Sequence, residues 1–244
     1  MDLFYRYLFT VLPINLLEIT AFAAGIYFLK HAKKKSLANK ALVYFLGFTL
    51  LIEFLAKYAA IAYFTKYKYF GEIKDTVIER TFWIYNIYEI IMYSIFIYFF
   101  SSLLISVKVK TIFKKLSFLF IVISVLNLIF SGVFFKASSI FTSVIGTLLL
   151  LIVIIYFYFD LLKTKRIINL KRYLPIYISI GVLIFILCIT PISIFSQYFK
   201  TINKSFIVLK TNILLLVNII MYGTFITGFI VCAKSNPSKE EMLN

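Results

Sequence analysis

The sequence has 244 residues, of which 62% are apolar, 19% are aromatic and only 15% are charged, with a mean hydropathy of +0.98. About a quarter of the residues in a soluble chain are charged, so this chain has too few polar side chains to cover a surface that faces water. The composition excludes a soluble fold and indicates a membrane protein. The net charge of +16 does not predict nucleic-acid binding, because Lys and Arg occur in short tracts between apolar stretches, where they act as topology signals.

Seven apolar stretches are long enough to cross a bilayer, which takes about 20 residues per helix. The connections between them are short, so we expect no soluble domain. The sequence predicts an all-α, polytopic membrane protein with one transmembrane domain over residues 1–244, built as a seven-transmembrane-helix bundle. The expected helices span 8–29, 41–64, 82–104, 116–135, 140–160, 174–196 and 207–232.

The distribution of Lys and Arg between alternate connections predicts the orientation. One set of connections carries 16 of these residues and the other set carries 9, with Lys57 inside a span. Because the richer set faces the cytoplasm in most membrane proteins, we expect the N-terminus outside and the C-terminus inside. The connection over 65–81 departs from this pattern, since it carries four basic residues on the side predicted to be external.

Four charged side chains lie well inside the expected spans, and all belong to the first three helices: Glu18, Glu53, Lys57 and Glu89. Asp160 and Lys210 stand at the ends of their spans. A charge near the centre of a membrane helix opposes insertion by about 2.5–3.5 kcal/mol, and such residues usually face a cavity or a partner. Lys57 follows Glu53 by four residues, so the two are expected to share a helix face and to form a pair. Three carboxyl groups and one ammonium leave an acidic excess, which a proton, a cation or a ligand must neutralise.

Other polar residues extend these faces by one or two helical turns. We therefore expect one polar intramembrane site for a ligand or an ion, made by the first three helices: Asn15, Glu18, Thr49, Glu53, Lys57, Tyr85, Asn86, Glu89 and Tyr93. The last span carries Asn218 and Tyr222 on one face as secondary candidates. The same span pairs Gly223 with Thr227 and Thr224 with Gly228, a small-residue pattern that predicts close helix packing.

The motifs of membrane enzymes are missing. The sequence has one histidine, His31, in a lysine-rich connection, whereas zinc hydrolases need several ligands at matched spacing and a serine nucleophile needs a base beside it. There is no nucleotide-binding or nucleophile-elbow motif. We therefore expect no catalytic residues, no metal site and no cofactor.

Three functions remain open. The first is a multi-pass membrane receptor or sensor that signals through a separate protein. The second is a proton- or cation-coupled transporter, or an oligomeric channel, that uses Glu18, Glu53 and Glu89. The third is a non-catalytic subunit of a membrane complex, in which the charges either lie at an interface or lock helices together.

The expected partners are the lipid bilayer, a small ligand or cation, and either further copies of the chain or a membrane or cytoplasmic protein. Nucleic acid is not expected. The abundance of Ile, Phe, Tyr, Lys and Asn is typical of an AT-rich genome and favours a bacterial plasma membrane.

Overall fold

The computed structural model describes residues 2–32, 36–164, 170–195 and 204–234. Within these residues the chain forms seven long helices and no strand, and every helix is long and apolar enough to cross a membrane. The helices are α1 (Asp2–His31), α2 (Leu37–Phe64), α3 (Phe82–Leu103), α4 (Val107–Phe130), α5 (Ile140–Leu162), α6 (Leu174–Phe195) and α7 (Lys204–Ala233). The predicted all-α, seven-helix membrane fold is confirmed.

The helix bounds lie within six residues of the sequence prediction except at α4, which is shifted toward the N-terminus of the chain. The helix begins nine residues earlier than the predicted 116–135, because Ser106 caps its first turn by accepting a hydrogen bond from the Val109 backbone N–H. It ends five residues earlier, where Gly132 takes a backbone φ of +66°, a conformation that favours glycine. The length of an apolar stretch predicts where the chain crosses the membrane, but capping residues determine where the helix begins and ends.

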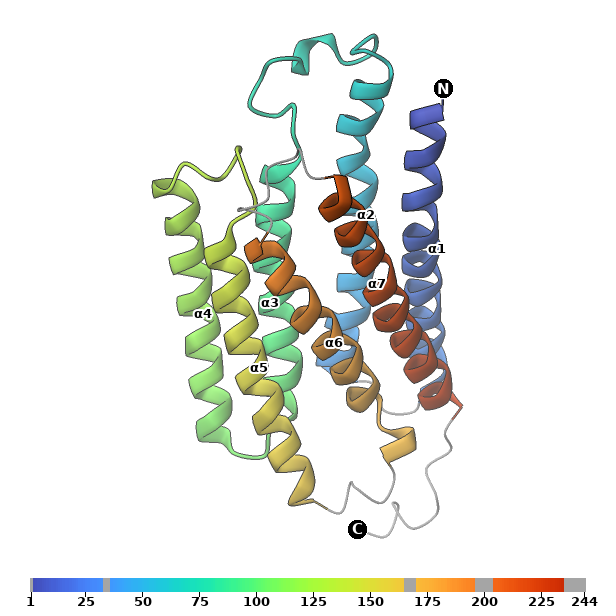
Figure 1. The fold of residues 1–244 in the computed structure, drawn as a ribbon. Helices are drawn as coiled ribbons and strands as arrows, with labels where there is room; N and C mark the ends of the chain where they lie inside the picture. Colours follow the sequence, from blue (N-terminus) through green and yellow to red (C-terminus); the bar gives the residue numbers. More distant parts are fainter. Residues whose placement is uncertain (1, 33–35, 165–169, 196–203, 235–244) are drawn as a thin grey trace.

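Six of the helices form a closed ring in the order α1, α2, α3, α5, α6 and α7 (Figure 1). Helix α7 packs against both α1 and α6, so the last helix of the chain closes the ring onto the first. Helix α4 stands outside this ring and packs against α3 and α5. The ring therefore brings α1 and α7, far apart in sequence, onto the same interior space.

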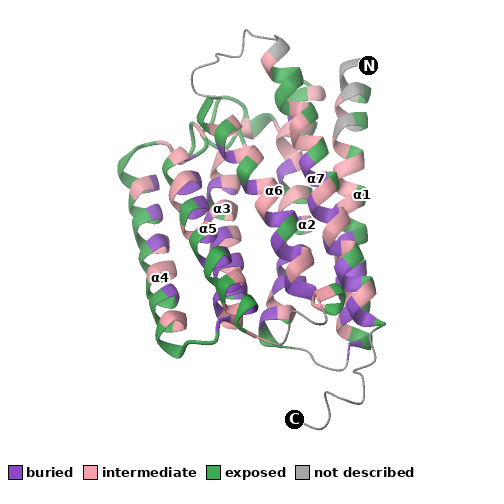
Figure 2. Cartoon of the chain, turned by 60° about the horizontal axis from the view of Figure 1, so that its bottom comes forward, coloured by how far each residue is buried: buried purple, intermediate pink, exposed green. Residues whose placement is uncertain are grey.

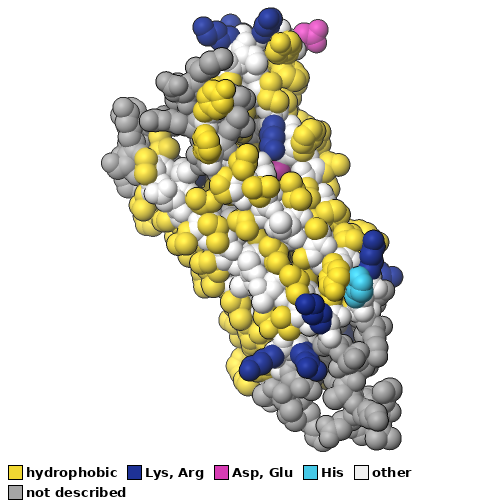
Figure 3. Space-filling view, turned by 90° about the vertical axis from the view of Figure 1, so that its right-hand side faces the viewer, with side chains coloured by type: hydrophobic (Ala, Val, Ile, Leu, Met, Phe, Trp, Pro, Cys, Tyr) yellow, Lys and Arg dark blue, Asp and Glu magenta, His cyan; other side chains and the backbone are white. Residues whose placement is uncertain are grey.

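Burial follows this arrangement, since buried residues concentrate on the faces that the helices turn toward one another (Figure 2). On the face shown in Figure 3 the outer surface is largely apolar, and Lys and Arg side chains gather mainly toward its two ends. Phe54, Phe118 and Phe130 are each more than two-thirds exposed, which suits contact with lipid rather than with water. Which end of the bundle faces the cytoplasm stays a prediction from the basic residues.

Glycines allow close packing between some helices. A Cβ atom at Gly228 of α7 would lie 2.6 Å from the Cβ of Tyr177 on α6, and one at Gly181 of α6 would collide with Thr224 on α7. A Cβ at Gly146 of α5 would run into the ring of Tyr93 on α3. The predicted packing role is confirmed for the Thr224 and Gly228 pair. It is wrong for Gly223, around which there is open space.

Polar side chains fasten α3 to the helices on the α5 side of the ring. Tyr93 shares a hydrogen bond with Thr147 of α5, 2.8 Å between the oxygens, and Thr147 shares another of 2.8 Å with Thr190 of α6. At one end of the bundle, Asp160 of α5 accepts a hydrogen bond from the backbone N–H of Ile105, which follows α3. These bonds join three helices of the ring.

Asn86 holds the connection between α4 and α5 against α3. Its Nδ2 donates to the carbonyl oxygens of Phe134 and Ala137, both at 3.0 Å, and its Oδ1 accepts from the backbone N–H of Ser139 at 2.9 Å. The Asn86 side chain is 1% exposed, so these three bonds satisfy the hydrogen-bonding groups of a buried amide that water does not reach.

The connection over 65–81, between α2 and α3, has its own internal bonds. Tyr67 donates to the Glu79 carboxylate, and Glu79 also accepts from the backbone N–H of Asp75. The hydrogen bond to Glu79 raises the pKa of Tyr67 above its ordinary value. Tyr58 of α2 donates to the Ile78 carbonyl at 2.5 Å, so the segment is tied back onto the bundle.

Replacement of Gly181 or Gly228 by Ala should destabilise the protein, because each new methyl group meets α6 or α7 atoms that have little room to move. Overpacking of this kind costs about 1–3 kcal/mol, which corresponds to a melting temperature lower by about 3–10 °C for a chain of this size. Gly223→Ala is the matched control on α7 and should leave the melting temperature unchanged or raise it. Equal effects at Gly223 and Gly228 would contradict the packing described.

Asn86→Ala should destabilise the protein through the loss of three hydrogen bonds, since each buried group left without a partner costs about 1–3 kcal/mol. The measurement is thermal unfolding in detergent, followed by tryptophan fluorescence. Asn39→Ala, at a half-buried position in the first turn of α2, serves as the comparison and should have a much smaller effect. A small effect of Asn86→Ala would show that the connection holds itself in place.

Candidate functional site

A cavity of about 470 Å³ lies inside the helix ring and extends from the middle of the bundle toward the end that carries the N-terminus. Residues of α1, α2, α3, α6 and α7 line it. Its polar lining consists of Tyr7, Asn15, Glu18, Thr49, Glu53, Tyr85, Tyr88, Asn218 and Tyr222, and the rest is apolar, including Phe45, Met92, Phe96, Phe185, Met221 and Phe225. A cavity of this size, mostly apolar with a few polar groups, is typical of a small-molecule site.

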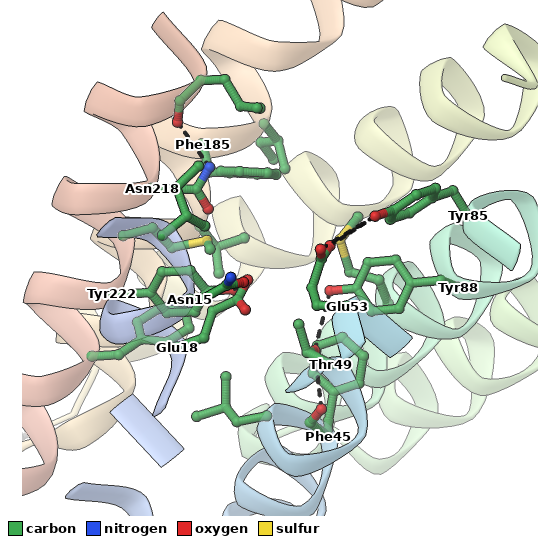
Figure 4. Close-up of a pocket in the computed structure, with 18 of the residues that line it drawn as sticks. Asn15, Glu18, Phe45, Thr49, Glu53, Tyr85, Tyr88, Phe185, Asn218 and Tyr222 are labelled. Atoms are coloured by element: carbon green, nitrogen blue, oxygen red, sulfur yellow. Dashed lines mark hydrogen bonds between the residues drawn. The ribbon is translucent and has the colours of Figure 1, made fainter. Parts of the chain in front are cut away.

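One wall of the cavity carries Glu18 of α1, which is only 5% exposed. Tyr222 of α7 donates its hydroxyl to Glu18 Oε1 at 3.1 Å, while Oε2 is buried and has no hydrogen-bond partner among the residues that the structure describes. Asn15 and Asn218 lie one turn away on the same two helices (Figure 4). Asn218 Nδ2 donates to the Leu214 carbonyl of its own helix at 2.8 Å, which leaves its side-chain oxygen for the cavity.

Glu53 of α2 faces Glu18 and Asn15 across the cavity (Figure 4). Tyr85 of α3 places its hydroxyl 3.3 Å and 3.2 Å from the two carboxylate oxygens of Glu53, within reach of either one. Glu53 is half-buried. The cavity therefore holds two carboxyl groups on opposite walls, each hydrogen-bonded to a tyrosine from a neighbouring helix.

A second tyrosine of α3 completes this side of the cavity. Thr49 donates its hydroxyl hydrogen to the Phe45 carbonyl at 3.1 Å, so the 3.1 Å bond between Thr49 and Tyr88 takes its hydrogen from Tyr88. The phenol oxygen of Tyr88 keeps its lone pairs for a further donor.

The predicted pair of Glu53 with Lys57 does not form. Among the described residues no ion pair joins the two side chains, and Lys57 is not among the residues that line the cavity. Its ammonium instead lies 6.0 Å from the centre of the Phe54 ring, which is 74% exposed. The i, i+4 spacing placed the residues on neighbouring parts of one face, but the long Lys57 stem reaches toward the outside of the bundle.

The predicted polar stripe on α3 divides into two neighbouring stripes that face different helices. Tyr85, Tyr88, Met92 and Phe96 follow a three-and-four spacing and line the cavity. The second stripe, one position further along, consists of Asn86, Glu89 and Tyr93, and it does not line the cavity. Asn86 bonds to the α4–α5 connection and Tyr93 bonds to α5. Glu89 lies beside Ser143 of α5.

The cavity thus gathers most, but not all, of the predicted residues. Asn15, Glu18, Thr49, Glu53 and Tyr85 line it, and so do the secondary candidates Asn218 and Tyr222. Sequence reasoning missed Tyr7 and Tyr88. The signal for Tyr88 was present, because it lies three residues after Tyr85 on the same face.

Aromatic side chains form the inner end of the cavity. Phe96 of α3 contacts Phe45 of α2 and Phe225 of α7, with ring centres 5.7 Å and 6.4 Å apart. Beyond them, Phe28 and Phe229 pack with ring centres 5.7 Å apart. Phe225 and Phe229 are fully buried, so an apolar layer separates the cavity from the other end of the bundle.

The electrostatic character of the cavity is acidic. Its described lining contains two carboxyl groups and no Lys, Arg or His. Within the described part of the chain no group of three or more His, Cys, Asp or Glu residues could hold a metal ion. A charged carboxylate in such a place requires hydrogen-bond donors or a cation as its partner.

Comparison with known protein families, curated proteins and solved structures found no match to this chain. The geometry of the cavity is therefore the basis for assigning a function.

The bond between Glu53 and Tyr85 can be tested with a double-mutant cycle of Glu53→Gln and Tyr85→Phe. We expect the two changes to be non-additive, with a coupling energy of about 1 kcal/mol, measured as a difference of about 2–4 °C in melting temperature. The control cycle combines Glu53→Gln with Lys57→Met and should show a smaller coupling energy, because those two side chains do not form an ion pair. If only the control cycle showed coupling, the result would mean that Glu53 pairs with Lys57 and not with Tyr85.

Proposed function

We propose that this protein is a multi-pass membrane receptor or sensor, which binds a small ligand in the cavity and signals through a separate protein. The main support is the shape of the cavity: a mostly apolar chamber with a few polar groups, which ends on packed aromatic side chains, with Phe96 and Phe225 at its inner end. A chamber that ends within the bundle suits a ligand that binds and leaves by the same route. Conduction needs a polar path, and the layer with Phe28 and Phe229 provides none.

Helices α3 and α7 are the proposed route of the signal. Both line the cavity in one half of the bundle and continue into the buried layer beyond it, where Phe99, Phe100 and Phe229 are fully buried. Since a packed core transmits small shifts instead of absorbing them, a ligand that moves Tyr88 or Tyr222 would move the far ends of these helices. The short basic connections at that end, which we place in the cytoplasm, would present the change to a partner protein.

Transport of protons or cations is the second candidate. The unpartnered, buried Oε2 of Glu18 and the facing Glu53 favour it, because carboxyl groups without a fixed cation can bind and release a proton or an ion. This function requires a second conformation in which the layer with Phe96 and Phe225 opens. A plasma-membrane location, with the cavity facing outward, is proposed for both functions.

Reconstitution into liposomes separates the two candidates. A receptor should show no proton or monovalent-cation flux above that of empty liposomes, in wild type and in Glu53→Gln alike. Flux in wild type that disappears in Glu53→Gln but persists in Glu89→Gln would overturn the receptor in favour of transport. Glu89 is the matched control, because it is a half-buried carboxyl residue of the same bundle that does not line the cavity.

Ligand-dependent stabilisation is the positive test of the receptor. A ligand that binds only the folded protein at 100 times its dissociation constant stabilises it by about 2.7 kcal/mol, a rise of about 5–11 °C in melting temperature for a chain of this size. Such a rise, reduced by Tyr88→Phe or Ile186→Trp in the cavity, supports binding there. A chain that shows neither stabilisation by any small molecule nor flux would be assigned to a complex as a non-catalytic subunit.

A further inference from the structure

We propose that the cavity selects an organic cation, an ammonium group attached to an apolar body. The head would lie between Glu18 and Glu53, and the body would lie against the aromatic inner end. This inference rests on the proposed receptor function and names the class of its ligand.

The charges of the lining support a cationic head group. Glu18 and Glu53 reach the cavity from different helices and opposite walls (Figure 4), and the described lining contains no basic side chain that could neutralise them. Lys57, the basic residue nearest in sequence, lies over Phe54 and does not line the cavity. An anionic ligand would face two carboxyl groups, and a neutral one would bring no positive charge to them.

The hydrogen-bonding groups support the same head group. Glu18 Oε2 is buried without a partner, and the side-chain oxygen of Asn218 is turned to the cavity, because its nitrogen is bonded to Leu214. The two carboxyl oxygens of Glu53 share one described donor, the Tyr85 hydroxyl, so this set of acceptors has room for further donors. An ammonium group has up to three N–H donors and no acceptor, which matches this set.

The apolar part of the lining supports an organic body over a bare ion. Phe45, Phe96 and Phe225 pack at the inner end, and the tyrosine rings of Tyr85, Tyr88 and Tyr222 surround the carboxyl groups. Aromatic rings attract cations through their faces and offer apolar contact to a hydrocarbon group. An inorganic ion would use only the carboxyl groups and leave most of the 470 Å³ cavity to water.

The test uses the purified full chain in detergent and three matched series of probes. Each probe is added at concentrations from about 0.1 to about 10 times its dissociation constant. Alkyl- and phenylalkyl-ammonium ions of increasing length are compared with the alcohols and the carboxylates of the same carbon skeletons. We expect ammonium ions to raise the melting temperature by about 3 °C or more at the top of this range, with the alcohols and carboxylates giving no comparable shift.

Variants separate recognition of the charge from general stabilisation. Glu18→Gln and Glu53→Gln should each weaken the apparent affinity for the ammonium ion about tenfold or more, because each removes a charge-assisted hydrogen bond, whereas Glu89→Gln should bind as wild type does. Glu53 is half-buried, so Glu53→Gln provides the test even if Glu18→Gln does not fold.

The outcomes keep this inference distinct from the proposed function. Stabilisation by alcohols or carboxylates that Ile186→Trp abolishes would overturn the cationic ligand and keep the receptor. Ammonium binding that is unchanged in both Glu variants would also overturn the inference, since the head group would then lie elsewhere. Absence of any stabilisation, together with cation flux through wild type, would overturn both.

Discussion

The hydrogen bond from Tyr222 to Glu18 joins the last helix of the chain to the first across 204 residues of sequence. Inside a membrane a carboxyl group has no water to satisfy it, so it must find a donor within the protein. Helix α7 supplies that donor while it packs between α1 and α6. This bond supports the packing of α7 against α1, which closes the ring around the interior cavity.

The same constraint explains how polar groups are distributed over α3. Asn86 and Tyr93 have fixed partners in the α4–α5 connection and in α5, and they serve the architecture. Tyr85 and Tyr88, on the adjoining stripe, bond to Glu53 and Thr49 of the neighbouring helix α2 and line the cavity. One face of α3 thus packs against neighbouring structure and the adjoining face lines the cavity. Residues next to each other in sequence belong to different faces.

This division shows what the sequence could and could not predict. The seven spans follow from apolar length, and Glu18 and Glu53 stand out because charges are rare within spans. The cavity wall could not be predicted from one helix at a time, because a helical period specifies a face and not the helix that the face meets. Glu89 was therefore placed with the other charges, although it faces α5, and Tyr222 ranked second because its partner lies at the other end of the chain.

Lys57 illustrates the same limit in electrostatic terms. A glutamate and a lysine four residues apart satisfy the helical rule for an ion pair, but Glu53 bonds to Tyr85 on another helix, and Lys57 lies against Phe54 at the lipid-facing surface. With the lysine outside, the cavity keeps its acidic character. Had the pair formed, the cavity would carry one carboxyl group in need of a partner instead of two.

The buried Oε2 of Glu18, which has no hydrogen-bond partner among the described residues, also bears on how a bound ligand could act. A buried carboxyl oxygen without a partner destabilises the empty protein, and a group that satisfies it stabilises whichever helix arrangement holds that group best. Because Glu18 is bonded to α7 and Glu53 to α3, a ligand that bridges the two carboxyl groups would couple the positions of both helices. Under the proposed function, the unsatisfied polar groups destabilise the protein without ligand. Because a ligand satisfies them, its binding can favour a different arrangement of α3 and α7.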